Sequence, residues 1–274
     1  MNNRLIVPFL MGQRRDGLCR VQEIDGHAWD VIAPSELHET DIEDPNEKLR
    51  RMGKIYHDLS EKVKNLATAG LVPISIAGDC VSTLGVLGGL QKAGKQPDRI
   101  LWLDAHGDFH TWDTSITKYI GGMPLAMLTG RGRWRKDRQD VIAPMLAEIG
   151  VTPYPEENII LSDARDLDPG EKEALEISKI TICSISDVPS HLFANESLYV
   201  HWDTDVVDAE METPALKYHV KHGPTYQEVA ALFKSISSKN ILAISVSAWH
   251  EEKDLENKAA MACLRVIKSL KDSV

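Results

Sequence analysis

Several features that would assign the chain to a common class of protein are missing or scarce. Only four cysteines occur among 274 residues and none forms a CxxC pair, which argues for reduced thiols and against a disulfide scaffold. No apolar stretch approaches the roughly 20 residues that cross a membrane, and the N-terminal residues lack the apolar length and the flanks of a signal peptide. We therefore expect a cytoplasmic protein without a membrane partner.

Positive charge is also in short supply. The 31 lysines and arginines are outnumbered by 41 aspartates and glutamates, so the formal net charge is −10. An acidic surface repels phosphate backbones, which argues against nucleic acid as a partner. The basic run from Arg131 to Arg138 we interpret as a solvated loop. The sequence contains no GxGxxG fingerprint, no P-loop and no GxSxG elbow, which argues against a dinucleotide site, a nucleotide-phosphate site and a serine nucleophile.

The chain does contain short apolar runs that alternate with longer amphipathic stretches, which indicates βαβ units and a parallel sheet. The apolar runs are continuous, as expected for strands covered by helices on both faces. We expect strands at Leu5–Phe9, Val72–Ala77, Ile100–Leu103, Ile159–Leu161, Thr181–Ser184, Leu198–Trp202 and Ile241–Val246. We expect helices at Asn46–Ala69, Thr83–Ala93, Pro169–Ile177, Tyr226–Ile236 and Glu256–Leu270, the fourth opened by a capping box of Thr225 and Glu228. Residues 1–274 are therefore predicted to form one α/β domain.

The most informative stretch follows the strand expected at Ile100–Leu103, which runs directly into Asp104, His106 and Asp108. In an extended chain, residues i, i+2 and i+4 share one face, so these side chains point the same way. Isolated charges at a buried strand end are costly to desolvate and need a cation or strong partners. The carboxyl ends of parallel strands are also where α/β folds bind ligands.

A second cluster repeats this pattern after the strand expected at Leu198–Trp202, where Asp203, Asp205 and Asp208 follow. Together the two clusters hold five acids and one histidine, a set that suits a pair of divalent cations bridged by carboxylates. Oxygen and imidazole ligands favour hard or borderline ions, with Mn²⁺ as the leading choice. The alternative is that each cluster caps a helix or pairs with lysines and arginines.

These residues resemble motifs of the arginase, agmatinase and formiminoglutamase family, the ureohydrolases, from about Val72 to the C-terminus. Residues 104–108 match the DAHxD motif, and residues 203–208 match the DxDxxDP motif with Ala209 in place of proline. Residues 164–171 are similar to the RDxDPGE segment, and residues 213–215 and 222–226 to the PA…GGLTY stretch. The motifs occur in the family's order along the chain.

The resemblance implies a three-layer α/β/α domain with a mostly parallel sheet of about eight strands, and a homo-oligomer, a trimer or hexamer. It also implies one or two Mn²⁺ ions and a small-molecule substrate, whose guanidinium or amidine carbon is attacked by a metal-activated hydroxide. On this template Asp104 and Asp203 bridge both ions. His106 and Asp205 complete one metal site, and Asp108 binds the other ion while it orients the hydroxide.

Three positions depart from the family pattern. Cys80 stands where the GGDHS motif has a histidine ligand, so it is either a softer metal ligand or a small buried apolar residue. Gly121 replaces the histidine of an HGxP motif that assists proton transfer, and we hypothesise that His110 takes over that role. Ala248 replaces an acid that binds the guanidinium, so Gly121 and Ala248 together change the expected substrate pocket.

Other candidates for the pocket are less distinctive. His222, after the second cluster, is an expected pocket residue, and Glu251 or Glu252 could substitute for the missing acid unless both are surface acids. Arg14 or Arg15 could bind a substrate carboxylate, although two surface arginines are the simpler interpretation.

The pattern of Cys80 and Gly121 is similar to the N-hydroxyarginine hydrolase branch of the family. We therefore expect a metal-dependent hydrolase of a linear C–N bond in a guanidine or modified guanidine. The alternatives are a catalytically silent relative that binds a metal or small ligand, and a metal-dependent amide or formimino hydrolase.

Overall fold

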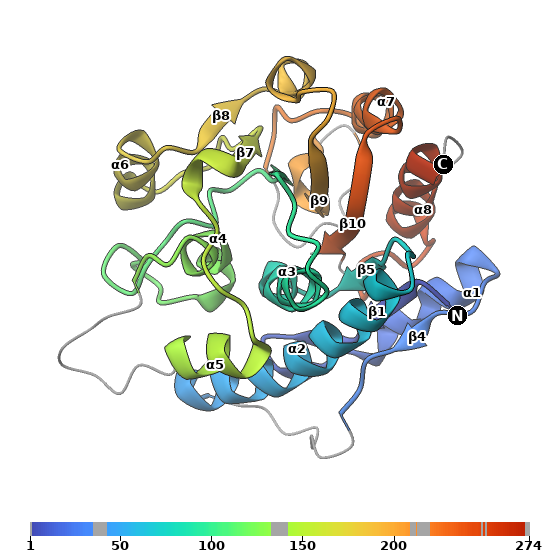
Figure 1. Ribbon diagram of the computed structural model, residues 1–274, viewed down its shortest axis with the longest axis horizontal. Coiled ribbons are helices and arrows are strands. Elements are labelled where there is room, and N and C mark those ends of the chain that lie inside the picture. The colour runs from blue at the N-terminus through green and yellow to red at the C-terminus, as the bar shows by residue number, and fades with distance from the viewer. Residues whose placement is uncertain are drawn as a thin grey trace.

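A wholly parallel sheet of eight strands forms the centre of the computed structural model (Figure 1), which describes residues 2–34, 43–132, 142–208, 212, 220–247, 249 and 251–271. Its strands are β1 (Arg4–Val7), β4 (Asp30–Val31), β5 (Ile74–Ala77), β6 (Arg99–Leu103), β7 (Ile159–Ser162), β8 (Thr181–Cys183), β9 (Ser197–Asp203) and β10 (Asn240–Ser247). They lie in the order β4-β1-β5-β10-β9-β6-β7-β8, and each neighbouring pair is parallel. The prediction of a parallel sheet of about eight strands is confirmed.

Helices cover both faces of the sheet, which gives three layers. They are α1 (Val21–Asp25), α2 (Pro45–Thr68), α3 (Thr83–Lys92), α4 (Pro124–Leu128), α5 (Ile142–Ile149), α6 (Pro169–Glu176), α7 (Tyr226–Ile236) and α8 (Lys258–Lys271). One apolar core joins α2, α3, α4 and α5 to one face, and a second core joins α1, α7 and α8 to the other. Continuous apolar strands thus fill two cores at once. Among the described helices, none is both long and apolar enough to cross a membrane.

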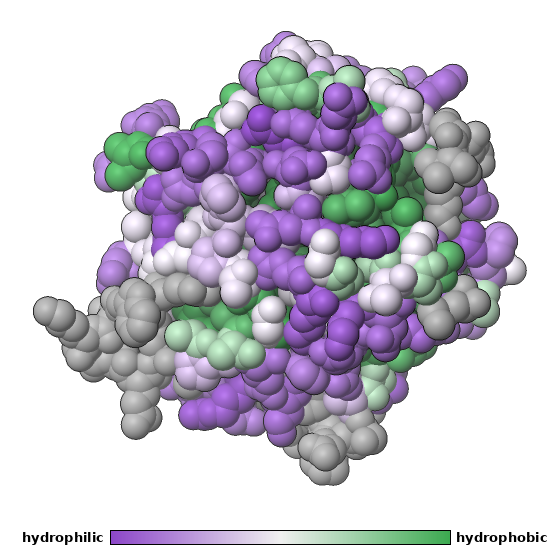
Figure 2. Space-filling view, in the orientation of Figure 1, coloured by the Kyte–Doolittle hydropathy of each residue, from purple (hydrophilic) through white to green (hydrophobic). Residues whose placement is uncertain are grey.

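The helix ends follow from local sequence. Asp44 accepts a hydrogen bond from the backbone N–H of Asn46 and Pro45 occupies the first turn, which together begin α2. The predicted capping box at the start of α7 is present, with Thr225 and Glu228 each bonded to the other's backbone. On the face seen in Figure 2, most of the surface is hydrophilic and the apolar residues form separate patches, as expected for helices that turn their apolar sides to the sheet.

The first predicted strand is shorter than expected because Pro8, which has no backbone N–H to donate, interrupts it. Beyond it a small antiparallel hairpin forms from β2 (Phe9–Leu10) and β3 (Gln13–Arg14). The edge strand β4 and the helices α1, α4 and α5 were not predicted.

The order of strands positions the site. β6 and β9 are neighbours in the sheet although they are far apart in the chain, and Leu103 lies opposite Trp202 in their register. The residues that follow both strands therefore emerge side by side at the same edge.

Candidate metal centre

The two acidic clusters meet at the carboxyl ends of β6 and β9. Asp104 follows β6, Asp203 ends β9, and Asp205 lies in the short 3-10 helix η6 (Thr204–Val206). All three carboxylates are almost completely buried. Burial and the neighbouring charge of Asp205 raise the pKa of both Asp104 and Asp203. Such a crowd of buried acids is electrostatically unfavourable unless a cation or an imidazolium balances it.

His106 supplies part of that balance on one side of the cluster. Its Nδ1 lies 3.3 Å from Asp104 Oδ1 and 3.3 Å from Asp205 Oδ2. Burial opposes protonation of His106, but the two acids outweigh it and raise the imidazole pKa. Asp104, His106 and Asp205 can all direct a ligand atom at a single ion. This is the set predicted for one metal site.

Cys80 closes the opposite side. It begins the 3-10 helix η2 (Cys80–Ser82), which follows β5. Its thiol donates a hydrogen bond to Asp203 Oδ2 at 2.8 Å and lies 3.0 Å from Ser247 Oγ. Burial, followed by the charge of Asp203, raises the thiol pKa well above its ordinary value. Cys80 is therefore part of the cluster and not only a filler of the apolar core, which favours the ligand interpretation.

A second possible ligand group contains Cys80, Asp104 and His201. His201 is on β9, two residues before Asp203, and it is completely buried. Burial lowers its imidazole pKa to about 3, so the ring is neutral. His201 is not among the site residues predicted from the sequence. The signal was available, because strand alternation places it on the same face as Asp203.

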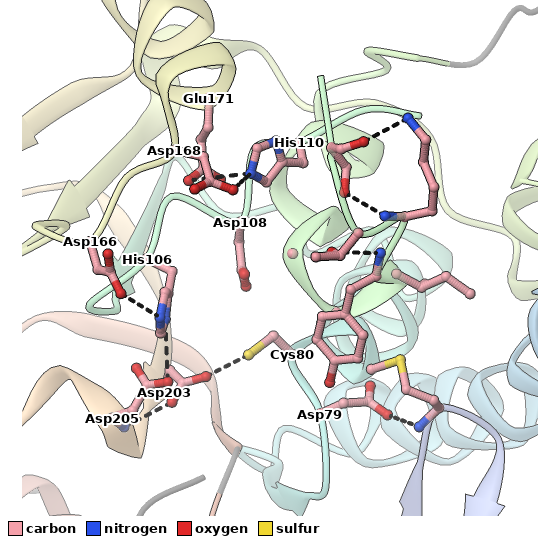
Figure 3. Close-up of a pocket in the computed structure, with 18 of the residues that line it drawn as sticks. Asp79, Cys80, His106, Asp108, His110, Asp166, Asp168, Glu171, Asp203 and Asp205 are labelled. Carbon is pink, nitrogen blue, oxygen red and sulfur yellow. Dashed lines mark hydrogen bonds and ion pairs between the residues drawn. The ribbon is translucent and has the colours of Figure 1, made fainter. Parts of the chain in front are cut away.

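The environment of Asp108 shows that the cluster fits a metal ion. It is buried, its φ is 50°, and its Oδ2 has no hydrogen-bond partner among the described residues. Burial and the charges of Asp104 and Asp203 raise its pKa well above the ordinary range. Figure 3 shows its carboxylate directed between His106 and Cys80. An unpartnered buried carboxylate oxygen beside other acids, in a backbone conformation that Asp seldom adopts, is what a site built for divalent cations would contain.

The cavity beside this cluster has a volume of about 700 Å³ and an acidic wall. Asp166 and Asp168 precede α6, and Glu171 lies in its first turn. Asp168 Oδ2 is 3.3 Å from His110 Nε2, and Glu171 Oε2 is 3.9 Å from the same nitrogen. His110 is thus held at the cavity wall, where it can take the proton-transfer role hypothesised from the sequence.

Glu171, the last residue of the segment similar to RDxDPGE, is a site residue that was not predicted from the sequence. It is buried, and its Oε1 accepts a hydrogen bond from the backbone N–H of Phe109 at 2.8 Å. Burial raises its pKa to about 7 in spite of this bond. A Cβ at Gly107 would lie 2.6 Å from Glu171 Cδ, so glycine is required for the close approach. Glu171 therefore holds the loop that carries Asp108.

Of the remaining residues predicted for the pocket, one lines the cavity and one does not. Gly121 lines the cavity, in the 3-10 helix η3 (Ile120–Gly122), with the ring of Tyr119 packed against it. His222 does not line it: its side chain is exposed, and its backbone N–H donates to Asp208 Oδ2 at 2.6 Å, which orders the loop after β9. Ala248 lies outside the described residues.

The charged candidates pair with one another outside the cavity. Arg14 contacts Asp16, and Arg15 lies between Glu251 and Glu252 with its Nε 3.1 Å from Glu251 Oε1. None of these arginines and glutamates lines the cavity. The expectation of two surface acids is wrong for Glu251, which is buried because it is paired with Arg15.

Comparison with known proteins agrees with this geometry. The model of the arginase family matches residues 15–271, so the chain belongs to that family. The match begins well before Val72, where the recognisable motifs start. The arginase of Brevibacillus brevis is 28% identical over 254 residues, which cover 86% of this chain and 81% of that protein. The arginase of Bacillus subtilis is 24% identical over 244 residues, which cover 82% and 78%.

A solved structure extends the likeness to the whole fold. The crystal structure of the arginase from Bacillus caldovelox superposes with a TM-score of 0.79 over 97% of this chain and 96% of that chain, at 23% identity. At that identity the likeness concerns the fold alone. The three-layer α/β/α architecture is therefore that of an arginase-like domain, and this chain is a divergent member of the family.

Proposed function

We propose that this chain is a metal-dependent hydrolase of a linear C–N bond in a guanidine or modified guanidine. The observation that carries the proposal is the meeting of two ligand clusters, after β6 and β9, at the floor of a cavity of about 700 Å³. Asp104, His106 and Asp205 would hold one divalent ion, with Mn²⁺ expected for these oxygen and imidazole donors. Asp104, Asp203, Asp108 and Cys80 surround a second position.

Ions bound there would lower the pKa of a bound water and polarise the carbon that it attacks. The chain's own residues would then position the reactants. Asp108 directs its carboxylate between His106 and Cys80, and its Oδ2, which has no partner among the described residues, can accept a hydrogen bond from the attacking water. His110, buried at the wall beside Asp168, can take up the proton and deliver it to the leaving nitrogen.

The charged residues of the cavity wall indicate which charged groups the substrate carries. Asp166 and Asp168 offer carboxylates to a cationic group such as an ammonium, whereas Lys48 and Lys118 also line the cavity and can meet an anionic group. This distribution suits a zwitterionic, amino-acid-like substrate.

The pocket favours a less basic guanidine than arginine itself. The family's guanidinium-binding acid is replaced by Ala248, and Glu251 is held outside the cavity by Arg15. An N-oxygenated guanidine is less basic than a guanidinium and needs that acid less. The likeness to the N-hydroxyarginine hydrolase branch rests on Cys80 and Gly121, whereas Ala248 departs from that branch, which keeps the acid. A trimeric or hexameric assembly and a cytoplasmic location stay predictions.

The test is a panel of substrates offered to protein loaded with Mn²⁺ or Zn²⁺: arginine, agmatine, N-hydroxyarginine, formiminoglutamate and a simple amide. Release of urea or hydroxyurea from the guanidines, abolished in Asp108→Asn, supports the proposal. Release of formamide alone would assign a formimino hydrolase instead. Stoichiometric metal without turnover of any compound would assign a catalytically silent relative.

A further inference from the structure

One buried imidazole next to the metal centre has no role in the chemistry described above. His201 lies in the middle of β9, opposite Trp102 of β6 and Ser245 of β10 in the register of the sheet. It is 0% exposed, and its Nε2 has no hydrogen-bond partner in the part of the chain that the structure describes. An unpartnered ring nitrogen at this depth is costly unless something binds it.

The other ring nitrogen of His201 is held in place. Nδ1 lies 2.9 Å from Ser245 Oγ, and Ser245 Oγ is itself bonded to the hydroxyl of Tyr199 at 2.5 Å. The ring also packs on Trp102, with centroids 4.2 Å apart. When Nδ1–H donates a hydrogen bond to Ser245 Oγ, Nε2 carries a lone pair. A hydrogen bond from the far nitrogen is how proteins orient a histidine that binds metal.

Two other possible metal ligands lie close to this ring. Cys80 Sγ, a carboxylate oxygen of Asp104 and a ring nitrogen of His201 all lie within 4.8 Å of one another. Bonds of about 2.0–2.3 Å from sulfur, nitrogen and oxygen to one ion require only a small contraction of this group. Trp102 stabilises the arrangement, because its Nε1 donates to Asp104 Oδ2 at 3.1 Å.

We propose that His201 is a ligand of the metal position next to Cys80, and that Cys80, Asp104 and His201 form a mixed sulfur, oxygen and nitrogen set selective for zinc-like ions over Mn²⁺. This inference rests on the metal centre of the proposed function and assigns its second position. His201 thereby supplies an imidazole in place of the family histidine that Cys80 replaces, and it does so from β9, which is separated from β5 by β10.

The ligand chemistry sets the selectivity. Thiolate and imidazole favour Zn²⁺ and Co²⁺, whereas carboxylate and water suit Mn²⁺. The group of Asp104, His106 and Asp205 contains no sulfur and keeps the Mn²⁺-like preference. The two positions of the centre therefore differ in the metal that they prefer, and Asp104 is common to both.

The experiment uses the full chain, stripped of metal with a chelator and titrated with Co²⁺ alone. Absorption spectroscopy reports a thiolate-to-cobalt charge-transfer band if Cys80 binds, and mass spectrometry of the metal gives the stoichiometry. We expect the band in the unaltered chain, its loss in Cys80→Ser, and its retention in Cys263→Ser, which alters another buried thiol outside the site. In competition, Zn²⁺ should displace one equivalent of Mn²⁺ and leave the other.

The decisive variant is His201→Asn, which keeps a donor to Ser245 but removes Nε2. We expect Co²⁺ to bind the Cys80 position about 10- to 100-fold more weakly, with a change in the d–d spectrum. His57→Asn, on α2 beside the backbone carbonyl of Glu148 and away from the cavity lining, should change neither. Should His201→Asn fold poorly, Ser245→Ala tests the same point more gently, because it removes the acceptor that orients the ring.

The outcomes separate this inference from the proposed function. Unchanged Co²⁺ affinity and spectrum in both His201→Asn and Ser245→Ala would overturn it. If those variants keep two equivalents of Mn²⁺ and full turnover while Asp205→Asn loses both, the hydrolase proposal stands and only the role of His201 fails. Absence of bound metal in the unaltered chain would overturn both.

Discussion

The thiol of Cys80 donates a hydrogen bond to Asp203 Oδ2 across 2.8 Å, joining the helical turn after β5 to the end of β9. The contact crosses the sheet at β10, whose Ser247 also lies 3.0 Å from the sulfur. The residue that departs most clearly from the family's motif is therefore bonded to one of its central acids. Binding of an ion by the thiolate releases the thiol proton, so affinity at this position rises with pH.

Replacing Cys80 with histidine should shift the metal preference. Cys80→His exchanges a soft sulfur for imidazole, and the added atoms can extend into the adjoining cavity. We expect Mn²⁺ affinity to rise about tenfold relative to Zn²⁺, about 1.4 kcal/mol. Competitive titration with mass-spectrometric metal analysis measures it, with Cys263→Ser as the control for loss of a thiol. An unaltered Mn²⁺-to-Zn²⁺ ratio would mean that residue 80 is not a ligand.

Asp108→Asn should affect the stripped and the metal-loaded proteins in opposite directions. Without metal, the buried carboxyl beside Asp104 and Asp203 must either carry an unfavourable charge or bind a proton, and Asn avoids both, so at pH 8 the free energy of unfolding should rise by about 1–2 kcal/mol. With metal, the loss of a ligand should remove most of the stabilisation that Mn²⁺ provides. Thermal unfolding with chelator and with excess Mn²⁺ measures both. Destabilisation under both conditions would contradict a site held open by charge repulsion.

Much of the fold could be predicted because its signals are local. Continuous apolar runs indicated seven of the eight strands, and the capping box set the first residue of α7. The strand β4 was not predicted because its two residues contain no periodic pattern. The end of β1 before Pro8 was not predicted either, because the apolar run continues to Phe9. These features depend on pairing with distant segments, which sequence alone does not contain.

The site was only partly predictable for the same reason. The aspartate clusters could be found because alternation within one strand places their side chains together. The meeting of Cys80 with His201 depends instead on the position of β10 between β5 and β9, which no local pattern specifies. The pairing of Glu251 with Arg15 likewise joins opposite ends of the chain.

The stability of the stripped protein should depend on Glu171. Burial raises its pKa from an ordinary 4.5 to about 7, so the folded state binds its proton more tightly than the unfolded state. The resulting stabilisation is fully present below about pH 4.5 and is lost as the pH rises through about 7, a loss of up to about 3 kcal/mol. Glu171→Gln should flatten this part of the pH profile.

Urea unfolding of chelator-treated protein between pH 4.5 and 8 measures that profile. Buried acids Asp104 and Asp203 act in the same direction, so a slope should persist in Glu171→Gln but be smaller. Glu173→Gln, exposed on the same helix, is the matched control and should leave the profile unchanged. Equal slopes in the unaltered chain and Glu171→Gln would contradict the assigned burial effect.

Restoring the family histidine at Gly121 should destabilise the protein unless Tyr119 is also changed. A Cβ at Gly121 would lie 2.4 Å from Tyr119 Cε1 and 2.9 Å from its hydroxyl, so the ring occupies the space that the side chain needs. Gly121→His should lower the free energy of unfolding by about 1–3 kcal/mol through overpacking. The double change with Tyr119→Ala should recover at least half of that loss. Denaturant unfolding of both variants and of Tyr119→Ala alone decides, and additive losses would show that the two positions do not compete.

His110 is the group that we expect to move the proton during turnover. Burial lowers its pKa even though Asp168 lies 3.3 Å away, so the imidazole is neutral near pH 7 and can accept a proton. Thr114 fixes the ring, with its Oγ1 3.1 Å from Nδ1. His110→Ala should therefore lower kcat at least about 10²-fold on a substrate found in the panel, with a smaller effect on KM.

The comparison needs two controls, because His110 also packs near Glu171. Metal content must stay at the unaltered value in His110→Ala, and His57→Ala should keep full activity. A general base leaves a further mark, since the rise of kcat with pH through the titration of the base should disappear in the variant. Unaltered turnover would exclude His110 from catalysis, and an equal loss of kcat that kept the pH dependence would assign it to positioning the cavity wall.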